Sequence, residues 1–269
     1  MPLDLDVILA PNPSPMTGRG TNTYVLGHDE GVVVVDPGPA DPGHLDAVAA
    51  RVAARGRAAV VLLTHHHLDH SQSGPEMAQR LGAPLAGMPH PLAPQLDREL
   101  VAETLELDGL HLTVLPTPGH CRDHACLAWE EELAVFAGDL VAGEGYIVID
   151  PPDGDMSDYL DSLRRIASPE LFGPRGGARV LLPGHGPAIQ DPRVYLAAYV
   201  AHRLEREARV LAALSHETRR TVEALLTLAY DDTPEFMHPV AARSLQAHLD
   251  KLVRDGIAEA DAEGYRRLK

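Results

Sequence analysis

Histidine and aspartate are concentrated in the stretch "THHHLDH" at residues 64–70, which follows the β-forming run "AVVLL". Residues two apart on a β-strand point to the same side, so His65 and His67 can offer two imidazoles to one metal ion. His66 then points to the other side and is the surplus histidine of the stretch. The spacing predicts one half of a metal site at the end of a strand.

Asp69 and His70 lie where the chain turns into the next helix, and they can face a second ion close to the first. Three further residues supply what two ions need, namely His120 in "TPGH", Asp139 in "FAGD" and His185 in "LLPGHG". Each follows a predicted strand beside a glycine, where the backbone can approach an ion, and such sheet edges carry the sites of α/β proteins. Asp139 is the natural ligand to bridge the two ions.

Imidazole and carboxylate ligands without thiolate suit Zn²⁺, although Mn²⁺ or Fe²⁺ also accept them. Two neighbouring ions acidify a bridging water to hydroxide at neutral pH, polarise a scissile carbonyl or phosphoryl oxygen and neutralise the leaving group. The sequence therefore predicts two Zn²⁺ ions as cofactors. The predicted reaction is hydrolysis of an ester, a thioester or a phosphodiester.

Apolar runs and helical stretches alternate up to about residue 190, which predicts the elements that position these residues. Strands are expected within 24–27, 32–38, 58–65 and 178–186. Hairpins are expected at 103–120, around Asp108-Gly109, and at 125–139. Helices are expected at 43–56, 74–82 and 157–167, the last of them capped by Ser157.

The C-terminal part begins with a long amphipathic helix from Asp191 to about Ser215. A helix, a polar turn, a second helix and two short strands follow, an order typical of a winged-helix module. We therefore expect a catalytic domain at 1–214 and a winged-helix-like domain at 215–269. Residues 216–269 contain eight basic and ten acidic residues, so packing or homodimer formation is the expected role of this tail.

The chain of 269 residues is long enough for one large domain with a small appendage. Its net charge of -16 argues against nonspecific binding of nucleic acid, though not against a specific site. Cys121 and Cys126 are too few for a disulfide framework, and the N-terminus has acidic residues where a signal peptide needs basic ones. No apolar run approaches the roughly 18 residues of a membrane span. We expect a soluble, cytoplasmic protein that does not bind membranes.

The motifs "THHHLDH", "TPGH", "AGD" and "PGHG", in this order, resemble those of the metallo-β-lactamase superfamily of dinuclear hydrolases. The resemblance implies an α+β fold, the four-layer αββα sandwich, and a metal-bridging hydroxide as nucleophile. It also implies the ligands of each ion. These are His65, His67 and His120 for the first ion, Asp69, His70 and His185 for the second, and Asp139 as the bridge.

Three residues are candidates for catalytic or supporting roles. Asp69 is expected to orient the hydroxide and accept its proton, as the family's aspartate is thought to do. Asp36 in "VVVVDPG" matches a family position that supports the metal site, and the alternative is a turn residue before Pro37. His124 is expected to contact the substrate or the leaving group, and the alternative is a half-exposed histidine at the start of a strand.

The segment "NPSPMTGRGTNTYVLG", the stretch that begins at "GDLVAGEGYIVIDPP" and the winged-helix tail resemble one lactamase-like subfamily. It includes an endoribonuclease that acts on single-stranded RNA, and this activity is the first expectation. Tyr146 departs from the small hydroxyl residue expected after "GEG" and puts ribonuclease activity in doubt.

Two alternatives remain open at the sequence level. A thioester hydrolase of the glyoxalase II type uses the same seven ligands, although glutathione-binding basic residues have no obvious counterpart in this tail. A metal-sensing DNA-binding regulator would need a basic recognition helix. That helix offers Arg243, Lys251 and Arg254 against Asp250 and Asp255.

Overall fold

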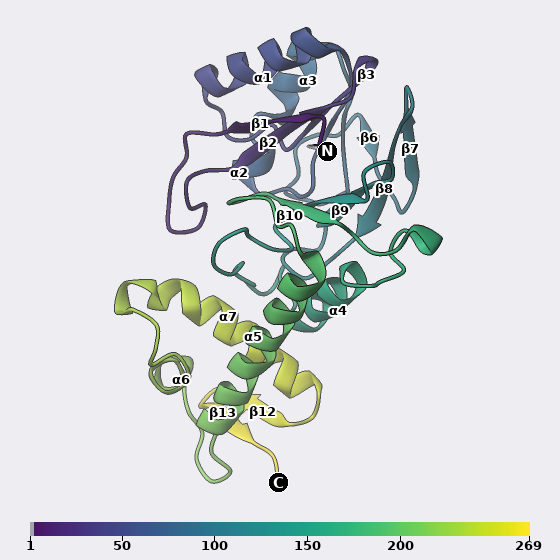
Figure 1. Ribbon diagram of the computed structural model, residues 1–269. Helices are drawn as coiled ribbons and strands as arrows, with labels where there is room; N and C mark the ends of the chain where they lie inside the picture. Colours follow the sequence, from purple (N-terminus) through teal and green to yellow (C-terminus); the bar gives the residue numbers. More distant parts are fainter. Residues whose placement is uncertain (1–2) are drawn as a thin grey trace. The chain divides into compact units, whose positions relative to one another are not determined.

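Two β-sheets carry the strand ends at which the predicted site residues lie (Figure 1). A computed structural model describes residues 3–269, so Met1 and Pro2 of the acidic N-terminus lie outside the described part. Contacts group the residues into two units. The first holds the described residues up to Thr117, Asp123–Ile147 and Ile166–Tyr195, and the second holds Pro118–Arg122, Val148–Arg165 and Leu196–Lys269. The predicted boundary between residues 214 and 215 stays a prediction, because this grouping does not say which segments fold on their own.

The first sheet has six strands. In spatial order they are β1 (Leu5–Leu9), β2 (Asn22–Leu26), β3 (Asp29–Val35), β4 (Gly56–Leu62), β5 (Leu85–Gly87) and β6 (Arg98–Glu99). The strands β1, β2 and β3 pair antiparallel, whereas β3 to β6 are parallel. The carboxyl ends of β3 and β4 therefore lie at the same edge of the sheet, and they lead to Asp36 and to His65.

The second sheet has five strands. In spatial order they are β11 (Val180–Pro183), β10 (Ala134–Gly138), β9 (Ala125–Trp129), β8 (Leu110–Pro116) and β7 (Thr104–Leu107). Both predicted hairpins, β7–β8 and β9–β10, are confirmed. Asp108 and Gly109 both have positive φ, as the tight turn between β7 and β8 requires. Because β10 and β11 are parallel, Asp139 and His185 follow neighbouring strand ends.

Apolar side chains from both sheets form one core, in which the rings of Tyr24 and Phe136 meet edge to face at 5.2 Å. A second core lies between the first sheet and its helices α1 (Pro42–Arg55) and α3 (Gly74–Leu81). The side chain of Asp41 caps α1, and Gly82, with a φ of 63°, ends α3. The rigid layers on both sides of the first sheet fix the strand ends on which the site depends.

The second unit contains α4 (Met156–Ile166) up to Arg165, α5 (Pro192–Ala213) beyond Tyr195, α6 (Val222–Ala229), α7 (His238–Arg254), β12 (Ala258–Asp261) and β13 (Gly264–Arg267). A core of its own joins α5, α6, α7 and the β12–β13 hairpin. The predicted order of helix, turn, helix and hairpin is confirmed, and it forms the winged helix.

The N-cap of α4 is Asp155, and the prediction that Ser157 caps this helix is wrong. Asp155 Oδ1 accepts hydrogen bonds from the backbone N–H groups of Ser157 at 2.8 Å and Asp158 at 3.1 Å. A carboxylate satisfies two of the N–H groups that a helix start leaves open and also interacts favourably with the helix dipole. Ser157 instead lies inside the first turn.

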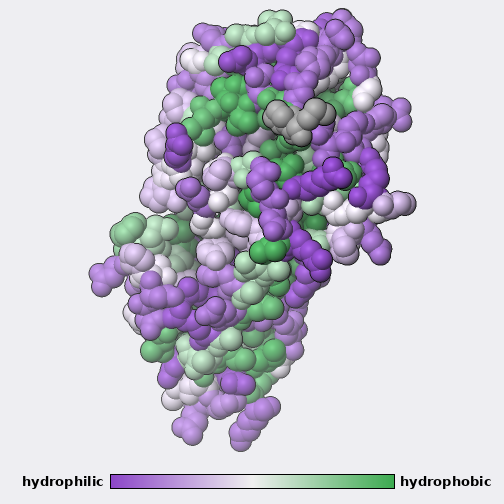
Figure 2. Space-filling view, viewed as in Figure 1, coloured by the Kyte–Doolittle hydropathy of each residue, from purple (hydrophilic) through white to green (hydrophobic). Residues whose placement is uncertain are grey.

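None of the helices within residues 3–269 is both long enough and apolar enough to cross a bilayer. Figure 2 shows hydrophilic side chains over much of the visible surface, with apolar ones in several groups between them.

The stability of the second unit should fall in mild acid, because burial and the neighbouring Arg203 and Arg206 lower the pKa of His202 to about 4. The unfolded chain binds this proton near pH 6.5, so the stabilisation is complete above that pH and is lost as the pH falls towards about 4. Replacement of His202 by glutamine should reduce the drop in melting temperature between pH 7.5 and pH 5. Equal drops in variant and wild type would contradict the assignment.

Candidate metal centre

Four side chains of the first unit point their donor atoms at one another. His70 Nε2 lies 3.4 Å from Asp69 Oδ2, from Asp139 Oδ1 and from His185 Nε2. His185 Nε2 lies 3.3 Å from Asp69 Oδ2 and 3.4 Å from Asp139 Oδ1. Ligands about 2.0–2.1 Å from a zinc ion stand about 3.3–3.4 Å apart at the corners of a tetrahedron. Five of the six donor pairs in this set therefore have the separation that a tetrahedral zinc ion requires.

These donors come from three places along the chain. Asp69 and His70 lie on the short helix α2 (Leu68–Ser71), whereas Asp139 follows β10 and His185 follows β11. Gly184 allows the close approach, because a Cβ there would lie 2.5 Å from His70 Cε1 and 2.8 Å from Asp139 Oδ1. The glycine beside the histidine in "PGHG" thus makes room for the cluster.

His65 and His67 also bring their nitrogens together, with His65 Nε2 3.1 Å from His67 Nδ1. The predicted strand geometry is wrong for this pair, because β4 ends at Leu62 and both histidines lie in the loop that follows. His65 also groups with His70 and Asp139, since one ligand atom of each lies within 4.8 Å of the others. The loop, not a strand face, places the pair beside the four-donor cluster.

The charges of the cluster suit a cation. Burial alone would lower the pKa of His70, but the carboxylates of Asp69, Asp139 and Asp36 raise it well above its ordinary value. Burial would also lower the pKa of His185, yet the carboxylates of Asp139 and Asp69 raise it to about 9. Burial would raise the pKa of Asp69, but the positive charges of His70 and His185 lower it to about 2. Protons on these imidazoles occupy the place of positive charge that a metal ion would take, so metal binding should release protons.

Asp36 lies directly behind His70. It is buried, and its Oδ2 accepts hydrogen bonds from His70 Nδ1 at 2.9 Å and from Thr64 Oγ1 at 2.7 Å, while Oδ1 accepts from Thr64 N–H at 2.8 Å. Asp36 also has a φ of 51°, an unusual conformation at the end of a strand. A carboxylate on Nδ1 leaves Nε2 as the ligand atom, which is the arrangement of metal-binding histidines.

His65 and His185 also have oxygen atoms as hydrogen-bond partners of their Nδ1 atoms. Thr64 Oγ1 donates to Asp36, so at 3.0 Å it can accept from His65 Nδ1. His185 Nδ1 lies 3.3 Å from the carbonyl oxygen of Gly20. In each case the partner on Nδ1 leaves Nε2 as the atom that would bind a metal.

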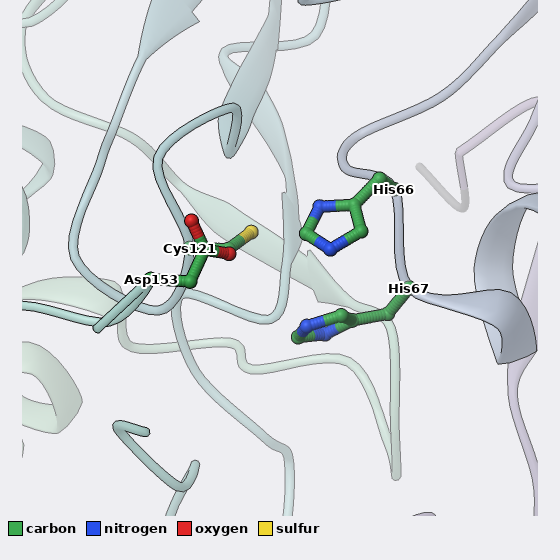
Figure 3. A group of neighbouring side chains, drawn as sticks. All are labelled: His66, His67, Cys121 and Asp153. Atoms are coloured by element: carbon green, nitrogen blue, oxygen red, sulfur yellow. The ribbon is translucent and has the colours of Figure 1, made fainter. Parts of the chain in front are cut away.

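His66 takes no part in the cluster and makes its hydrogen bond elsewhere. His66 Nδ1 bonds Asp123 Oδ1 at 2.8 Å, and the ring stacks on that of His90 at 4.0 Å with planes 11° apart. Figure 3 shows the side chains of His66 and His67 on successive residues of the loop, with their rings at different angles. His66 is therefore the residue that the sequence set aside as surplus.

His124 is fully buried, unlike the half-exposed histidine considered from the sequence. Its Nε2 accepts from the backbone N–H of Asp139 at 3.0 Å, so the proton is on Nδ1, which donates to the carbonyl oxygen of Thr117 at 3.1 Å. Burial lowers the pKa of His124 to about 4, against the opposing effect of Asp139. A neutral ring with both nitrogens engaged by the protein is placed to support Asp139.

His120 lies in the second unit, within Pro118–Arg122. Its Nδ1 lies 2.8 Å from the carbonyl oxygen of Val148, which leaves Nε2 as the atom with which it would bind a metal. Its assignment to the first ion stays a prediction. Tyr146, near the end of the first unit's middle segment, has a half-exposed side chain, and its influence on substrate choice also stays a prediction.

The sequence reasoning missed Thr21 and Asn12. Thr21 Oγ1 donates to Asp69 Oδ2 at 3.2 Å, and Asn12 holds Thr21 by two hydrogen bonds, from Asn12 Nδ2 to Thr21 Oγ1 at 3.0 Å and from Thr21 N–H to Asn12 Oδ1 at 2.9 Å. The turn-rich segment "NPSPMTGRGTN" was the available signal, since such a polar loop needs a partner for its hydroxyl and amide groups.

Two family models match the chain. The Metallo-beta-lactamase superfamily model matches residues 16–172, and the Beta-lactamase associated winged helix domain model matches residues 221–266. The first match spans more than half of the chain and contains six of the seven predicted ligands. His185 lies beyond it, although the structure brings this residue into the four-donor cluster.

Similar proteins match this chain over most of its length. The Beta-lactamase-like protein 2 homolog of Drosophila melanogaster is 31% identical over 280 residues, 96% of this chain and 92% of the relative. The Atrochrysone carboxyl ACP thioesterase of Aspergillus fumigatus is 32% identical over 222 residues, 80% of this chain and 67% of the relative. A metallo-beta-lactamase family protein from Thermus thermophilus has a crystal structure with a TM-score of 0.80 at 25% identity, and the match covers 98% of both chains.

One family accounts for the motifs, the two sheets, the cluster of donors at the strand ends and these similarities. The predicted α+β fold is confirmed, and divalent metals are the cofactors that this fold generally binds. The chain belongs to the metallo-β-lactamase superfamily and is a hydrolase with a C-terminal winged-helix domain.

Proposed function

We propose that this protein is a thioester hydrolase that works with two divalent cations, Zn²⁺ in the first place. The observation that carries the metal centre is the set of four donors from Asp69, His70, Asp139 and His185, in which five of the six donor pairs lie 3.3–3.4 Å apart. In the same proposal His65, His67 and His120 hold the first ion, the last of them on the family resemblance alone. When bound, such ions bring the pKa of a water molecule close to neutrality and polarise the carbonyl that is attacked.

Side chains of the protein hold the metal ligands in the right tautomer and accept the proton of the attacking water. Asp36 and Thr64 hold His70 and His65 in the tautomer that binds metal, as their hydrogen bonds imply. Asp69 has a side chain that is 30% exposed, whereas that of Asp139 is 9% exposed. Asp69 is therefore the carboxylate of the cluster that a substrate and the attacking water can reach, and we assign to it the acceptance of the proton.

Two observations favour a thioester over RNA. Relatives of this chain from Aspergillus chevalieri and Aspergillus fumigatus are named Atrochrysone carboxyl ACP thioesterase. The net charge of -16 opposes the approach of a phosphodiester chain more than that of a neutral thioester carbonyl. The order of the two enzyme activities expected from the sequence is therefore reversed here, with hydrolysis of single-stranded RNA second.

A regulator that binds DNA is disfavoured by the contacts of α7. Arg243 Nη1 donates to Asp150 Oδ2 at 3.1 Å, and Arg254 forms an ion pair with Asp155. Lys251 bonds Glu207 at 3.0 Å. The three basic residues of the predicted recognition helix are thus engaged by carboxylates of their own unit, which leaves little positive charge for phosphates.

The test compares three substrates with the purified, zinc-loaded protein: a short acyl thioester of pantetheine, S-lactoylglutathione and single-stranded RNA. We expect turnover of the pantetheine thioester, loss of that turnover after chelation, and recovery when Zn²⁺ is returned. The zinc-loaded protein should contain about two ions per chain. Cleavage of RNA alone would overturn the thioester proposal, and a protein that binds no metal would overturn the metal-centre assignment as well.

The location of the protein in the cell is a separate question, and the expected cytoplasmic location stays a prediction.

A further inference from the structure

The ring of His124 lies against the backbone that carries Asp139. The N–H of Asp139 donates to His124 Nε2 at 3.0 Å, and this donation fixes the proton of the ring on Nδ1. The hydroxyl and the carbonyl oxygens of Thr117 lie 2.9 Å and 3.1 Å from that Nδ1. The tautomer is the one found in the metal-binding histidines, but the lone pair of Nε2 is occupied by a backbone N–H group.

The backbone around His124 is fixed as firmly as its ring. Its carbonyl oxygen accepts from Thr117 N–H at 2.8 Å, and the next residue, Ala125, donates its N–H to the carbonyl oxygen of Thr64 at 2.9 Å. Thr64 precedes His65 and also bonds Asp36. His124 is thus anchored to two other segments of the first unit and gives Asp139 a rigid acceptor.

The ring of His124 occupies the space that a side chain at Gly138 would need. A Cβ on this residue, which has a φ of 46°, would lie 2.8 Å from His124 Nε2 and 2.7 Å from Thr64 Oγ1. The ring therefore packs directly against the peptide backbone just before Asp139. We expect loss of the ring to remove both this packing and the acceptor of the Asp139 N–H group, so that the backbone that carries the carboxylate is held less firmly.

The position of Asp139 matters more than that of an ordinary ligand. Its Oδ1 lies 3.4 Å from the Nε2 atoms of both His70 and His185, and the same carboxylate is the proposed bridge between the ions. Groups that orient metal ligands change metal affinity by about 10–100-fold when they are removed. A small shift of this carboxylate should therefore weaken both ions together.

We propose that His124 is a positioning residue, which fixes the bridging Asp139 through the hydrogen bond from its backbone N–H and does not contact the substrate. This inference rests on the metal centre of the proposed function. It replaces the contact with substrate or leaving group that the sequence led us to expect. His124 thereby supports the carboxylate as Asp36 supports His70, but through the backbone instead of the side chain.

Two substitutions of His124 test the contacts of its two ring nitrogens one at a time. In His124→Gln the side-chain oxygen can take the place of Nε2 and accept from Asp139, whereas in His124→Asn the shorter chain reaches only the Thr117 side. We expect competition with a chromophoric chelator to give a zinc dissociation constant within a few-fold of wild type for His124→Gln. For His124→Asn and His124→Leu it should rise about 10–100-fold. The loss of thioester hydrolysis should fall on kcat, with KM nearly unchanged.

The matched control is His44→Gln, which removes another buried imidazole of the first unit, one that bonds Thr23 Oγ1 at 2.9 Å. Zinc affinity should stay at the wild-type value in this control. Wild-type zinc affinity in His124→Asn, equal losses in the asparagine and glutamine variants, or a rise in KM alone would each overturn the proposal.

Hydrogen exchange in the metal-free protein provides a measurement that needs neither zinc nor substrate. The amide of Asp139 should be protected in wild type and in His124→Gln and should exchange faster in His124→Asn. If the wild-type protein binds no zinc, the proposed function fails, and this exchange pattern still decides whether His124 holds Asp139. Equal exchange in all three proteins would overturn the positioning role by itself.

Discussion

Replacement of Asp69 by asparagine should lower kcat/KM for thioester hydrolysis by roughly 10³-fold, the range of a lost general base. Asparagine keeps the size of the side chain and an oxygen for the hydrogen bond from Thr21, but it removes the negative charge beside His70 and His185. The pKa of Asp69, lowered to about 2, keeps this carboxylate ionised throughout the neutral range. Steady-state kinetics with the pantetheine thioester measure the effect, and zinc analysis separates loss of the ion from loss of the base.

The control for this substitution is Asp46→Asn on α1. Asp46 is an exposed carboxylate that bonds Arg80 at 2.6 Å, and exposed ion pairs contribute little to stability. Its variant should keep wild-type activity, and both variants should keep the wild-type circular dichroism spectrum. Full activity in Asp69→Asn, or an equal loss in both variants, would remove Asp69 from the mechanism.

His120 of the second unit is the predicted third ligand of the first ion. His120→Ala should therefore lose activity to a similar degree.

The elements that carry the site were predictable because their signals are local. Asp108-Gly109 between two alternating runs specifies a hairpin by the backbone conformation it favours, and Gly82 marks the end of a helix for the same reason. The six candidate ligands in the first unit could be named because the motifs that carry them come after strands and have distinctive neighbours, and their role as ligands stays a prediction. Asp139 and His185 come together because the parallel strands β10 and β11 end at the same edge of the second sheet, whereas Asp69 and His70 reach them from the first sheet.

The contacts that hold the ligands in place were not predictable, because they join residues far apart in the sequence. The polar loop around Thr21 indicates that its groups need partners, but it does not indicate that Asp69 is one of them, and nothing local indicates that His124 accepts from Asp139. Two other predictions were wrong for reasons closer at hand. The strand β4 ends three residues before His65, and Asp155 takes the cap from Ser157 through hydrogen bonds to residues two and three positions further on.

Replacement of Gly184 by alanine should abolish tight binding of the second zinc ion and lower hydrolysis by about 100-fold or more. The new Cβ would lie 2.5 Å from His70 Cε1, a contact that a methyl group cannot make, and 2.8 Å from Asp139 Oδ1. His70 cannot turn away freely, because Asp36 holds its Nδ1. A misplacement of about 1 Å at a reacting centre can cost about 10²-fold in rate. Zinc per chain and kcat/KM are the measurements.

Gly43→Ala is the matched control, since the same methyl group there would meet only Asp41 Oδ1 at the ordinary distance of 3.4 Å, within the first turn of α1. Alanine is the better helix former, so this variant should bind zinc normally and be slightly more stable than wild type. A Gly184→Ala protein that keeps two zinc ions would mean that the donors at the ends of β10 and β11 do not meet as closely as 3.4 Å when the ions are bound. The four-donor centre would then have to be given up, because its assignment rests on that spacing.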